Sequence, residues 1–401
     1  MRTSRILSIV GASTRAAAFS ALRAGFSPRC ADLFADRDLA KYCHVTRVSG
    51  RSYPDGFLSF LEQGLAVPWI YTGGLENHPA LIEKMSSVRE LWGNGRSAVA
   101  AARSTGHVRS LFRRAGLPCP RVHSLNELPA KDVRWLLKSP VSTGGSDVSW
   151  WPGDKPHAGA HPDSYLQEYI EGEPCAAIFI GEGNGARFLG LTRQLVGEEW
   201  LHAKPFHYCG SIGPLPMDAE LHHACEALGN VIAIGCGLRG VFGVDCVLHD
   251  RMLWPIEINP RYPASAEILE MGLGQSILAA HCQVFDQEIE LATRAVPAAP
   301  PRIVGKGILF AKEALAFPDE GPWLNDSEES KPPHPSVPAF ADIPFPGEQI
   351  PAGRPIFTIF AKASSLEECI PSLRRRVAEV ERLLYPPDSR TGVPACAGPF
   401  A

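Results

Sequence analysis

The sequence lacks the patterns that are typical of disulfide-bonded secreted proteins, of proteins with structural metal sites and of membrane proteins. Its 11 cysteines are odd in number, and none of them forms a Cys-x-x-Cys pair. Several lie inside apolar segments, so we expect buried, reduced thiols and a cytoplasmic protein rather than a disulfide-bonded one. No apolar run approaches the ~18 residues that span a bilayer, so no membrane partner is expected.

An excess of charge of one sign is also missing. The 39 Lys and Arg residues are set against 43 Asp and Glu residues, and the formal net charge is −4. A nucleic-acid partner is therefore not expected. With 45% hydrophobic and 20% charged residues the composition is that of a globular protein, and 401 residues are enough for two or three domains.

The N-terminal segment predicts a unit of parallel sheet. An apolar run at 6–10 precedes a Gly-Ala-Ser-Thr loop, a helix predicted at 16–24 and a second strand predicted at 29–33. This order of strand, loop, helix and strand is typical of a Rossmann-like domain. The loop reads GASTRA and lacks the second and third glycines of the dinucleotide fingerprint, so a Rossmann oxidoreductase is disfavoured.

A lysine precedes a Ser/Thr/Gly loop in the middle of the chain. Lys138 lies in a strand predicted at 135–139, and residues 142–146 read Ser-Thr-Gly-Gly-Ser. Bare backbone N–H groups, hydroxyls and a cation suit phosphate, and glycine permits close approach. On its own, this pattern fits a flexible hairpin turn beside a surface lysine slightly better.

A second candidate site is the stretch at 239–261. Its runs VFGVDCVL and MLWPIEIN, joined by a polar turn, predict an antiparallel hairpin. Alternation along the second run places Glu257, Asn259 and Arg261 on one face, and Asp245 can face them from the neighbouring strand. Two carboxylates and a carboxamide are hard oxygen ligands of the kind that Mg²⁺ takes, and an arginine beside them suits phosphate or carboxylate. The alternative is a salt-bridged sheet face without a ligand.

Residues 197–217 are predicted to form a long loop rich in Gly, Pro, aromatic residues and His. Loops of such length are usually functional or disordered, and the aromatic residues argue against disorder. We therefore expect this loop to be functional. The candidate substrate contacts in and beside it are Arg193, Lys204, His207 and Tyr208, with ordinary loop structure as the alternative for all four.

Taken together, these stretches resemble the ATP-grasp superfamily of carboxylate–amine or carboxylate–thiol ligases. The resemblance is carried by Lys138, the STGGS loop, QEYIEGEP at 167–174, GVDCVL at 243–248, EINPR at 257–261 and YTGGLENHPALIEKM at 71–85. It implies a multidomain α/β and α+β fold. The implied parts are a Rossmann-like domain at 1–84, an ATP-grasp domain at 85–292 with ATP between its two subdomains, a small C-terminal α+β domain at 302–385 and a tail at 386–401.

The resemblance also implies roles for individual residues. Lys138 would contact the α- and β-phosphates of ATP, and Arg261 would steady the γ-phosphate or an acyl phosphate, so both are predicted to be catalytic. The metal, Mg²⁺ or Mn²⁺, would be held by Asp245, Glu257 and Asn259. The other implied ATP contacts are Gly144, Gly145 and Ser146 over the phosphates, Glu168, Tyr169 and Ile170 at the adenine, and Glu173 at the ribose.

One departure from the family pattern lies in the helix predicted at 97–115. Members usually carry a lysine there, whereas this stretch contains RSTGHVR and no lysine. Arg103 could take its place in binding ATP, because a guanidinium also binds phosphate. Otherwise ATP would bind more weakly, and the alternative function would be an inactive or weakly active ATP-binding sensor or scaffold.

The implied reaction forms an acyl phosphate and ADP from a carboxylate and MgATP. An amine or thiol then attacks the acyl carbon and releases phosphate. Glutamate or another amino acid is expected as one substrate, in a step of cofactor or small-peptide biosynthesis. The expected partners are therefore small molecules and, from the resemblance alone, a second copy of the chain in a homodimer.

Overall fold

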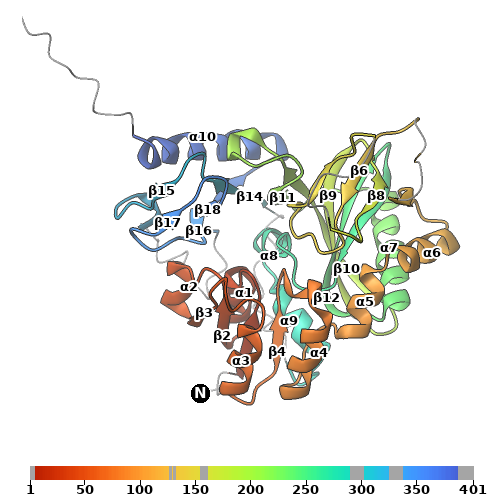
Figure 1. The fold of residues 1–401 in the computed structure, drawn as a ribbon, viewed down its shortest axis with the longest axis horizontal. Helices are drawn as coiled ribbons and strands as arrows, with labels where there is room; N and C mark the ends of the chain where they lie inside the picture. The colour runs from red at the N-terminus through yellow and green to blue at the C-terminus, as the bar shows by residue number, and fades with distance from the viewer. Residues whose placement is uncertain are drawn as a thin grey trace, which may run out of the picture.

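The computed structural model describes residues 5–125, 129, 132–153, 161–289, 302–324 and 337–386. Its helices surround three sheets and one short ladder (Figure 1). The predicted domain boundary at 292–302 lies mostly outside these residues, as does the predicted tail after residue 386. None of the described helices has the length and apolar character needed to cross a membrane.

The N-terminal part is a four-stranded parallel sheet in the order β3-β2-β1-β4. Its strands are β1 (Arg5–Val10), β2 (Phe26–Asp32), β3 (His44–Arg47) and β4 (Trp69–Tyr71). Its helices are α1 (Arg15–Arg23), α2 (Arg37–Tyr42), α3 (Gly56–Gln63), the short turn η1 (Leu75–Asn77) and α4 (Pro79–Val88). The strand–helix–strand unit predicted from residues 6–33 is thus confirmed, while β3 and α3 were not predicted.

The helix predicted at 97–115 is two helices, α5 (Arg96–Arg103) and α6 (Thr105–Ala115). They separate at Ser104, which has an extended backbone and whose hydroxyl accepts a hydrogen bond from the His107 N–H at 3.3 Å. This N-cap starts a new helix in a stretch whose composition is helical throughout. Gly116, in a left-handed conformation, ends α6 as expected.

The small sheet has four antiparallel strands in the order β5-β8-β6-β7. They are β5 (Val122–Ser124), β6 (Trp135–Lys138), β7 (Val148–Trp150) and β8 (Tyr165–Glu168). Lys138 pairs directly with Tyr165 on one side and Val148 on the other, so the three side chains share a face. The opposite face buries Trp135, Leu137 and Leu166 in an apolar cluster.

The large sheet has eight strands in the order β13-β12-β9-β10-β11-β14-β18-β16. They are β9 (Glu173–Glu182), β10 (Ala186–Val196), β11 (Tyr208–Gly213), β12 (Arg239–His249), β13 (Met252–Asn259), β14 (Ile303–Phe310), β16 (Phe340–Ala341) and β18 (Pro355–Ala363). The remaining elements are η2 (Glu199–Leu201), α7 (Ala219–Cys236), α8 (Ala266–Leu273), α9 (Ile277–Gln283), the ladder of β15 (Leu315–Ala316) with β17 (Gln349–Ile350), η3 (Pro322–Leu324) and α10 (Leu366–Leu384).

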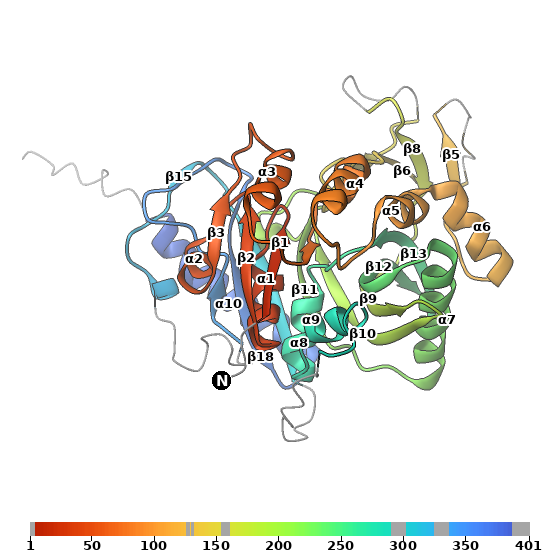
Figure 2. The ribbon, with the colours of Figure 1, turned by 90° about the horizontal axis from the view of Figure 1, so that it is seen from below.

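Helices pack on the large sheet and connect it to the N-terminal sheet. Helix α7 packs on β9 and β10, where Leu228 and Ile232 join Phe179 in one apolar cluster. Helix α1 of the N-terminal part packs against α8 and α9, which in turn contact strands of the large sheet (Figure 2). Helix α10 lies on β14 and β18. This packing fixes the N-terminal part beside the large sheet.

Two sequence predictions about the large sheet were wrong or incomplete. The segment 197–217 is not a continuous loop, because it contains η2 and the six-residue strand β11. The strand runs between β10 and β14, with Ser211 opposite Lys306. The C-terminal strands β14, β18 and β16 therefore extend the large sheet, and the predicted C-terminal domain does not have a sheet separate from it.

Candidate functional site

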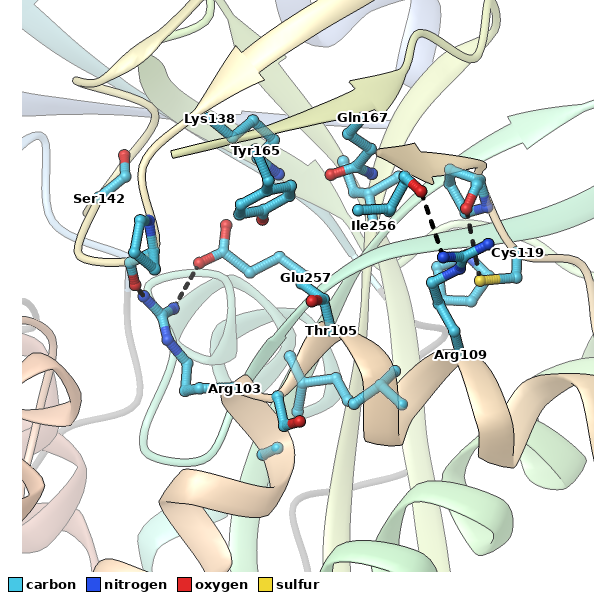
Figure 3. A pocket seen from close by; sticks show the side chains of 18 of the residues that line it. Arg103, Thr105, Arg109, Cys119, Lys138, Ser142, Tyr165, Gln167, Ile256 and Glu257 are labelled. Atoms are coloured by element: carbon cyan, nitrogen blue, oxygen red, sulfur yellow. Dashed lines mark hydrogen bonds and ion pairs between the residues drawn. The ribbon is translucent and has the colours of Figure 1, made fainter. Parts of the chain in front are cut away.

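A cavity of about 310 Å³ lies between the small sheet, helices α5 and α6, and the edge strand β13 (Figure 3). Lys138 lines it from β6, Glu257 from β13, and the helices contribute Arg103 and Arg109. Its described lining carries three cationic side chains and two carboxylates, the second being Asp163. The excess of positive charge suits a polyanionic ligand.

The side chain of Lys138 points from the small sheet into this cavity. It is only 8% exposed, and its ammonium has no hydrogen-bond or ion-pair partner within the described residues. A buried cation without a partner is costly, so an anion in the cavity would stabilise it. Tyr165 and Gln167 line the cavity from β8, at the alternating positions that face the same way.

The predicted hairpin of β12 and β13 is confirmed. Asp245 pairs directly with Glu257, and a bulge follows Asp245. The carboxylate of Asp245 accepts hydrogen bonds from the Asn259 Nδ2 and the Gln194 Nε2, both at 2.9 Å. Burial, and then the charge of Glu257, raise the pKa of Asp245 to about 6. The structure thus brings the predicted metal ligands together.

The two carboxylates, Asp245 and Glu257, are the members of this set that suit a magnesium ion. Two facing carboxylates repel one another unless a cation lies between them. Within the described residues no group of three or more His, Cys, Asp or Glu could hold a metal. The predicted ligand set is two carboxylates and one carboxamide. Mg²⁺ suits such a set, because it usually keeps several waters and binds one or two carboxylates together with substrate phosphates. The Asn259 Oδ1 is engaged by the Arg261 Nη2 at 2.8 Å.

Arg261 is held by a residue that the sequence did not reveal. Its Nε donates to Glu76 Oε1 at 3.0 Å, and Glu76 lies in η1 of the N-terminal part. The side chains of Arg261 and Glu76 are 11% and 3% exposed, and among the described residues the second carboxylate oxygen of Glu76 has no hydrogen-bond partner. Nothing local in the stretch TGGLEN indicates this pairing, which joins positions far apart in the chain.

Arg103 lies where the sequence predicted a substitute for the missing lysine. Its Nη1 donates to Glu257 Oε1 at 2.8 Å, the bond drawn in Figure 3, and its Nη2 donates to Asn77 Oδ1 at 3.0 Å. Arg109, one helix further on, also lines the cavity and donates to the Val122 carbonyl at 3.2 Å. Helices α5 and α6 therefore each present a guanidinium to the cavity.

The β6–β7 loop (residues 139–147) carries the predicted phosphate contacts. Its residues Ser139, Pro140 and Ser142 line the cavity, whereas Gly144, Gly145 and Ser146 do not. The Tyr208 N–H donates to the Gly144 carbonyl at 3.0 Å. Gly145 has a φ of +80°, and a Cβ there would overlap with the Phe206 carbonyl. The loop therefore rests against residues 206–208.

The predicted adenine hinge adjoins the cavity without lining it. The Glu168 carboxylate accepts from the Arg121 N–H at 2.9 Å and from its Nε at 3.1 Å. The N–H groups of Glu168 and Tyr169 donate to the carbonyls of Arg121 and Arg134, both at 2.9 Å. The Ile170 N–H has no backbone acceptor within the described residues. Of the three hinge N–H groups, that of Ile170 is the one left for a base.

The four predicted substrate contacts do not line the cavity. Arg193 lies 3.8 Å from Glu173, the predicted ribose contact, and both side chains are partly exposed. Lys204 is exposed, and burial together with the Lys204 charge lowers the pKa of His207. The Tyr208 hydroxyl hydrogen-bonds to Ser211 at 2.8 Å. Their assignment to substrates stays a prediction.

Comparison with known proteins finds a family-model match and curated relatives for part of this chain. Residues 107–265 match the family model of an ATP-grasp domain. A 3-methyl-D-ornithine–L-lysine ligase of Methanosarcina barkeri is 22% identical over 54% of this chain and 56% of its own length. An uncharacterized protein of Methanocaldococcus jannaschii is 27% identical over 54% of this chain and 46% of its own length. The chain spans about half the length of these curated relatives.

Solved structures resemble the chain over nearly its whole length. A biotin carboxylase from Campylobacter jejuni has a TM-score of 0.65 and 16% identity, covering 91% of this chain and 89% of its own. An L-amino acid ligase from Bacillus licheniformis has a TM-score of 0.63 and 16% identity, covering 94% and 98%. At this identity the likeness shows the fold. The family model shows an ATP-grasp domain at residues 107–265, and the chain as a whole shares the fold of these solved structures.

Proposed function

We propose that the chain is an ATP-dependent ligase that joins a carboxylate to an amine or a thiol through an acyl phosphate. The observation that carries this proposal is the single cavity in which Lys138, without a partner in the described residues, faces Glu257. A cation on one wall and a carboxylate beside Asp245 on the other suit the two ends of a metal-bound triphosphate.

The chain's own residues would bind and orient the nucleotide. Lys138, Arg103 and Arg109 would contact phosphate oxygens, and Ile170 would donate its N–H to the base. Glu257, Asp245 and Asn259 would hold Mg²⁺, or Mn²⁺ in its place. When bound, the metal supplies charge neutralisation at the transferring phosphoryl oxygens.

In the first step a substrate carboxylate oxygen attacks the γ-phosphorus, and the bond to ADP breaks. In the second step the amine or thiol attacks the acyl carbon, loses a proton, and phosphate leaves. Arg261 would hold the transferred phosphoryl group, because its planar fork matches a phosphate. Bond making here depends mainly on positioning, which a rigid cavity supplies.

Amino acids are the substrate class that the relatives favour. One curated relative is named for an ornithine derivative and lysine, and one solved neighbour is an L-amino acid ligase. We therefore propose an amino acid, glutamate among the candidates, as one substrate, in a cofactor or small-peptide pathway. The ten free cysteines of the described residues support a reducing, cytoplasmic location. A homodimer stays an expectation from the family.

A second candidate function is an ATP-binding sensor or scaffold without turnover. The observation that favours it is the ion pair of Arg103 with Glu257. If this pair persisted in the presence of nucleotide, the carboxylate would be withheld from the metal. The first experiment below separates the two functions.

The test is ADP release by the full chain with MgATP, screened against pools of amino acids and small carboxylates. Asp245→Ala is the inactive variant. Asp250→Asn is the matched control, because Asp250 lies in the exposed turn of the same hairpin. ADP that depends on one pool, is lost in Asp245→Ala and is retained in Asp250→Asn would support the ligase. MgATP binding without ADP release from any pool would favour the sensor.

A further inference from the structure

Asn77, the last residue of η1, uses both ends of its carboxamide. Its Nδ2 donates to the Val141 carbonyl at 2.8 Å and to the Thr143 Oγ1 at 2.9 Å. Its Oδ1 accepts from the Arg103 Nη2 at 3.0 Å. One side chain of the N-terminal part therefore joins the β6–β7 loop to helix α5 at the border of the cavity.

The arginine that Asn77 holds is itself central to the cavity. Arg103 donates to Glu257 Oε1 at 2.8 Å and to the Pro140 carbonyl at 2.5 Å. Its side chain is only 18% exposed, so these acceptors surround it on several sides. A long side chain with fixed acceptors has few rotamers left. Asn77 thus restricts where the Arg103 guanidinium lies relative to Glu257.

The β6–β7 loop is held from two sides. On one side Asn77 binds Val141 and Thr143. On the other side Gly144 and Gly145 rest against residues 206–208, where β11 begins. Gly144 and Gly145 of the loop therefore contact the large sheet, whereas Val141 and Thr143 are bound to the N-terminal part.

We propose, resting on the function proposed above, that Asn77 is a positioning residue of the nucleotide site. Its donor end holds the β6–β7 loop over the phosphates. Its acceptor end holds Arg103 where it meets Glu257 and, in the nucleotide complex, a phosphate. Asn77 acts through these neighbours, so the N-terminal part of the chain contributes to how tightly the site closes on ATP.

Asn77→Ala removes both ends of this link. We expect the amides of residues 141–146 to exchange with deuterium about tenfold faster, and the Kd for MgADP to rise about tenfold, on the scale of two lost hydrogen bonds. Asn77→Asp separates the two ends, because a carboxylate still accepts from Arg103 but cannot donate to Val141. Its loop exchange should lie between those of the wild type and Asn77→Ala, because the Thr143 hydroxyl can donate to the new carboxylate, and its rise in Kd should be smaller.

Two further variants complete the comparison. Thr143→Val removes one of the two loop acceptors and should speed exchange less than Asn77→Ala does. Asn230→Ala is the matched control. Asn230 lies on α7, away from the cavity, and its Oδ1 accepts a hydrogen bond from the Ala186 N–H at 2.8 Å. It should leave both loop exchange and nucleotide affinity unchanged.

The measurements are hydrogen–deuterium exchange by mass spectrometry and titration calorimetry with MgADP, on the full chain. Wild-type protein that binds MgADP, with unchanged exchange and Kd in Asn77→Ala, would overturn this inference alone. Wild-type protein that fails to bind MgADP would overturn the proposed function and, with it, the nucleotide role of Asn77. Should Asn77→Ala fail to fold, the Thr143→Val and Asn77→Asp variants decide the question in the same way.

Discussion

Arg103 donates a hydrogen bond to Glu257 across 2.8 Å, from the end of α5 to the edge strand of the large sheet. The same guanidinium is bound to Asn77 of the N-terminal part. In the proposed site, Glu257 therefore has a cation beside it before any metal arrives. Arg103 and the metal would compete for the Glu257 carboxylate. The contribution of Glu257 to nucleotide affinity should therefore depend on whether magnesium is present.

Glu257→Gln should change nucleotide binding in opposite directions with and without metal. Without Mg²⁺, ATP should bind about tenfold more tightly, because a repelling charge is gone and Arg103 is released toward phosphate. With Mg²⁺, binding should weaken about tenfold and ADP release should fall about 100-fold or more, because a metal ligand is lost.

Calorimetry with ATP in a chelator and with MgATP measures both directions. Glu182→Gln is the control, because that glutamate pairs with Arg187 at the exposed end of β9. Equal changes in the two conditions would contradict the assignment of Glu257 to the metal.

Two buried lysines should respond differently to replacement by methionine. Lys138 has no partner in the described residues, so Lys138→Met should leave the melting temperature within a few degrees and raise the Kd for MgATP about tenfold or more. Lys306 binds Glu267 at 3.2 Å and the Ala264 carbonyl at 2.7 Å. Lys306→Met should cost about 3 kcal/mol of stability by breaking a buried ion pair.

Denaturant unfolding and calorimetry on both variants check this contrast. A large loss of stability in Lys138→Met would mean that Lys138 serves the fold rather than a ligand. Normal MgATP affinity in that variant would remove it from the site.

Affinity for MgADP should fall below about pH 6. The pKa of Asp245 is raised to about 6 by burial and by Glu257, so a proton competes with the metal below that value. The expected loss is about tenfold per pH unit for one competing proton, with little change between pH 7 and 8.

The effect on stability has the opposite sign. An unfolded aspartate titrates near 3.9, so the metal-free folded state binds more protons between about pH 4 and 6. From this group alone, folding is therefore favoured as the pH falls through that range. Calorimetry and urea unfolding from pH 5 to 8 measure both trends, and Asp245→Asn should remove them while Asp250→Asn keeps them.

Gly145→Ala should disturb the site more than Gly144→Ala. Both glycines have positive φ, so both variants carry a backbone strain of about 1 kcal/mol. A Cβ at Gly144 meets nothing within 4 Å, whereas one at Gly145 overlaps with the Phe206 carbonyl. We expect a several-fold rise in the Kd for MgADP in Gly145→Ala beyond any in Gly144→Ala. Similar values in both variants would mean that the contact with residues 206–208 does not hold the loop.

The hairpin of the site could be predicted from sequence because its determinants are local. Alternation places Glu257 on the face that Asp245 shares, and the turn at Asp250 and Arg251 has positive φ at both residues, as a tight hairpin requires. The lysine before the glycine loop was found for the same reason, since a strand and its following loop are adjacent in the chain.

Strand β11 and the role of Glu76 could not be predicted in this way, because both depend on contacts with residues far away in the chain. The stretch YCGSIG lacks the apolar alternation of a strand, and a side chain at Gly210 would collide with the Lys306 carbonyl of β14. The sequence around Glu76 does not distinguish it from a surface carboxylate, and only the fold brings Arg261 beside it. The break at Ser104 was missed because the helix-forming composition continues across it.

The continuity of the large sheet determines the shortest fragment of the chain that we expect to fold without exposing a sheet edge. Strand β11 is paired with β10 on one side and β14 on the other. A fragment ending near residue 290 would strip β14 and β18 away, leaving one flank of β11 unpaired and uncovering Leu195 and Cys209, which pack with Leu309. An open edge beside exposed apolar side chains invites other copies to add strands. The segment that matches the family model therefore depends on β14 and β18, which lie outside it, for a closed sheet and a covered core.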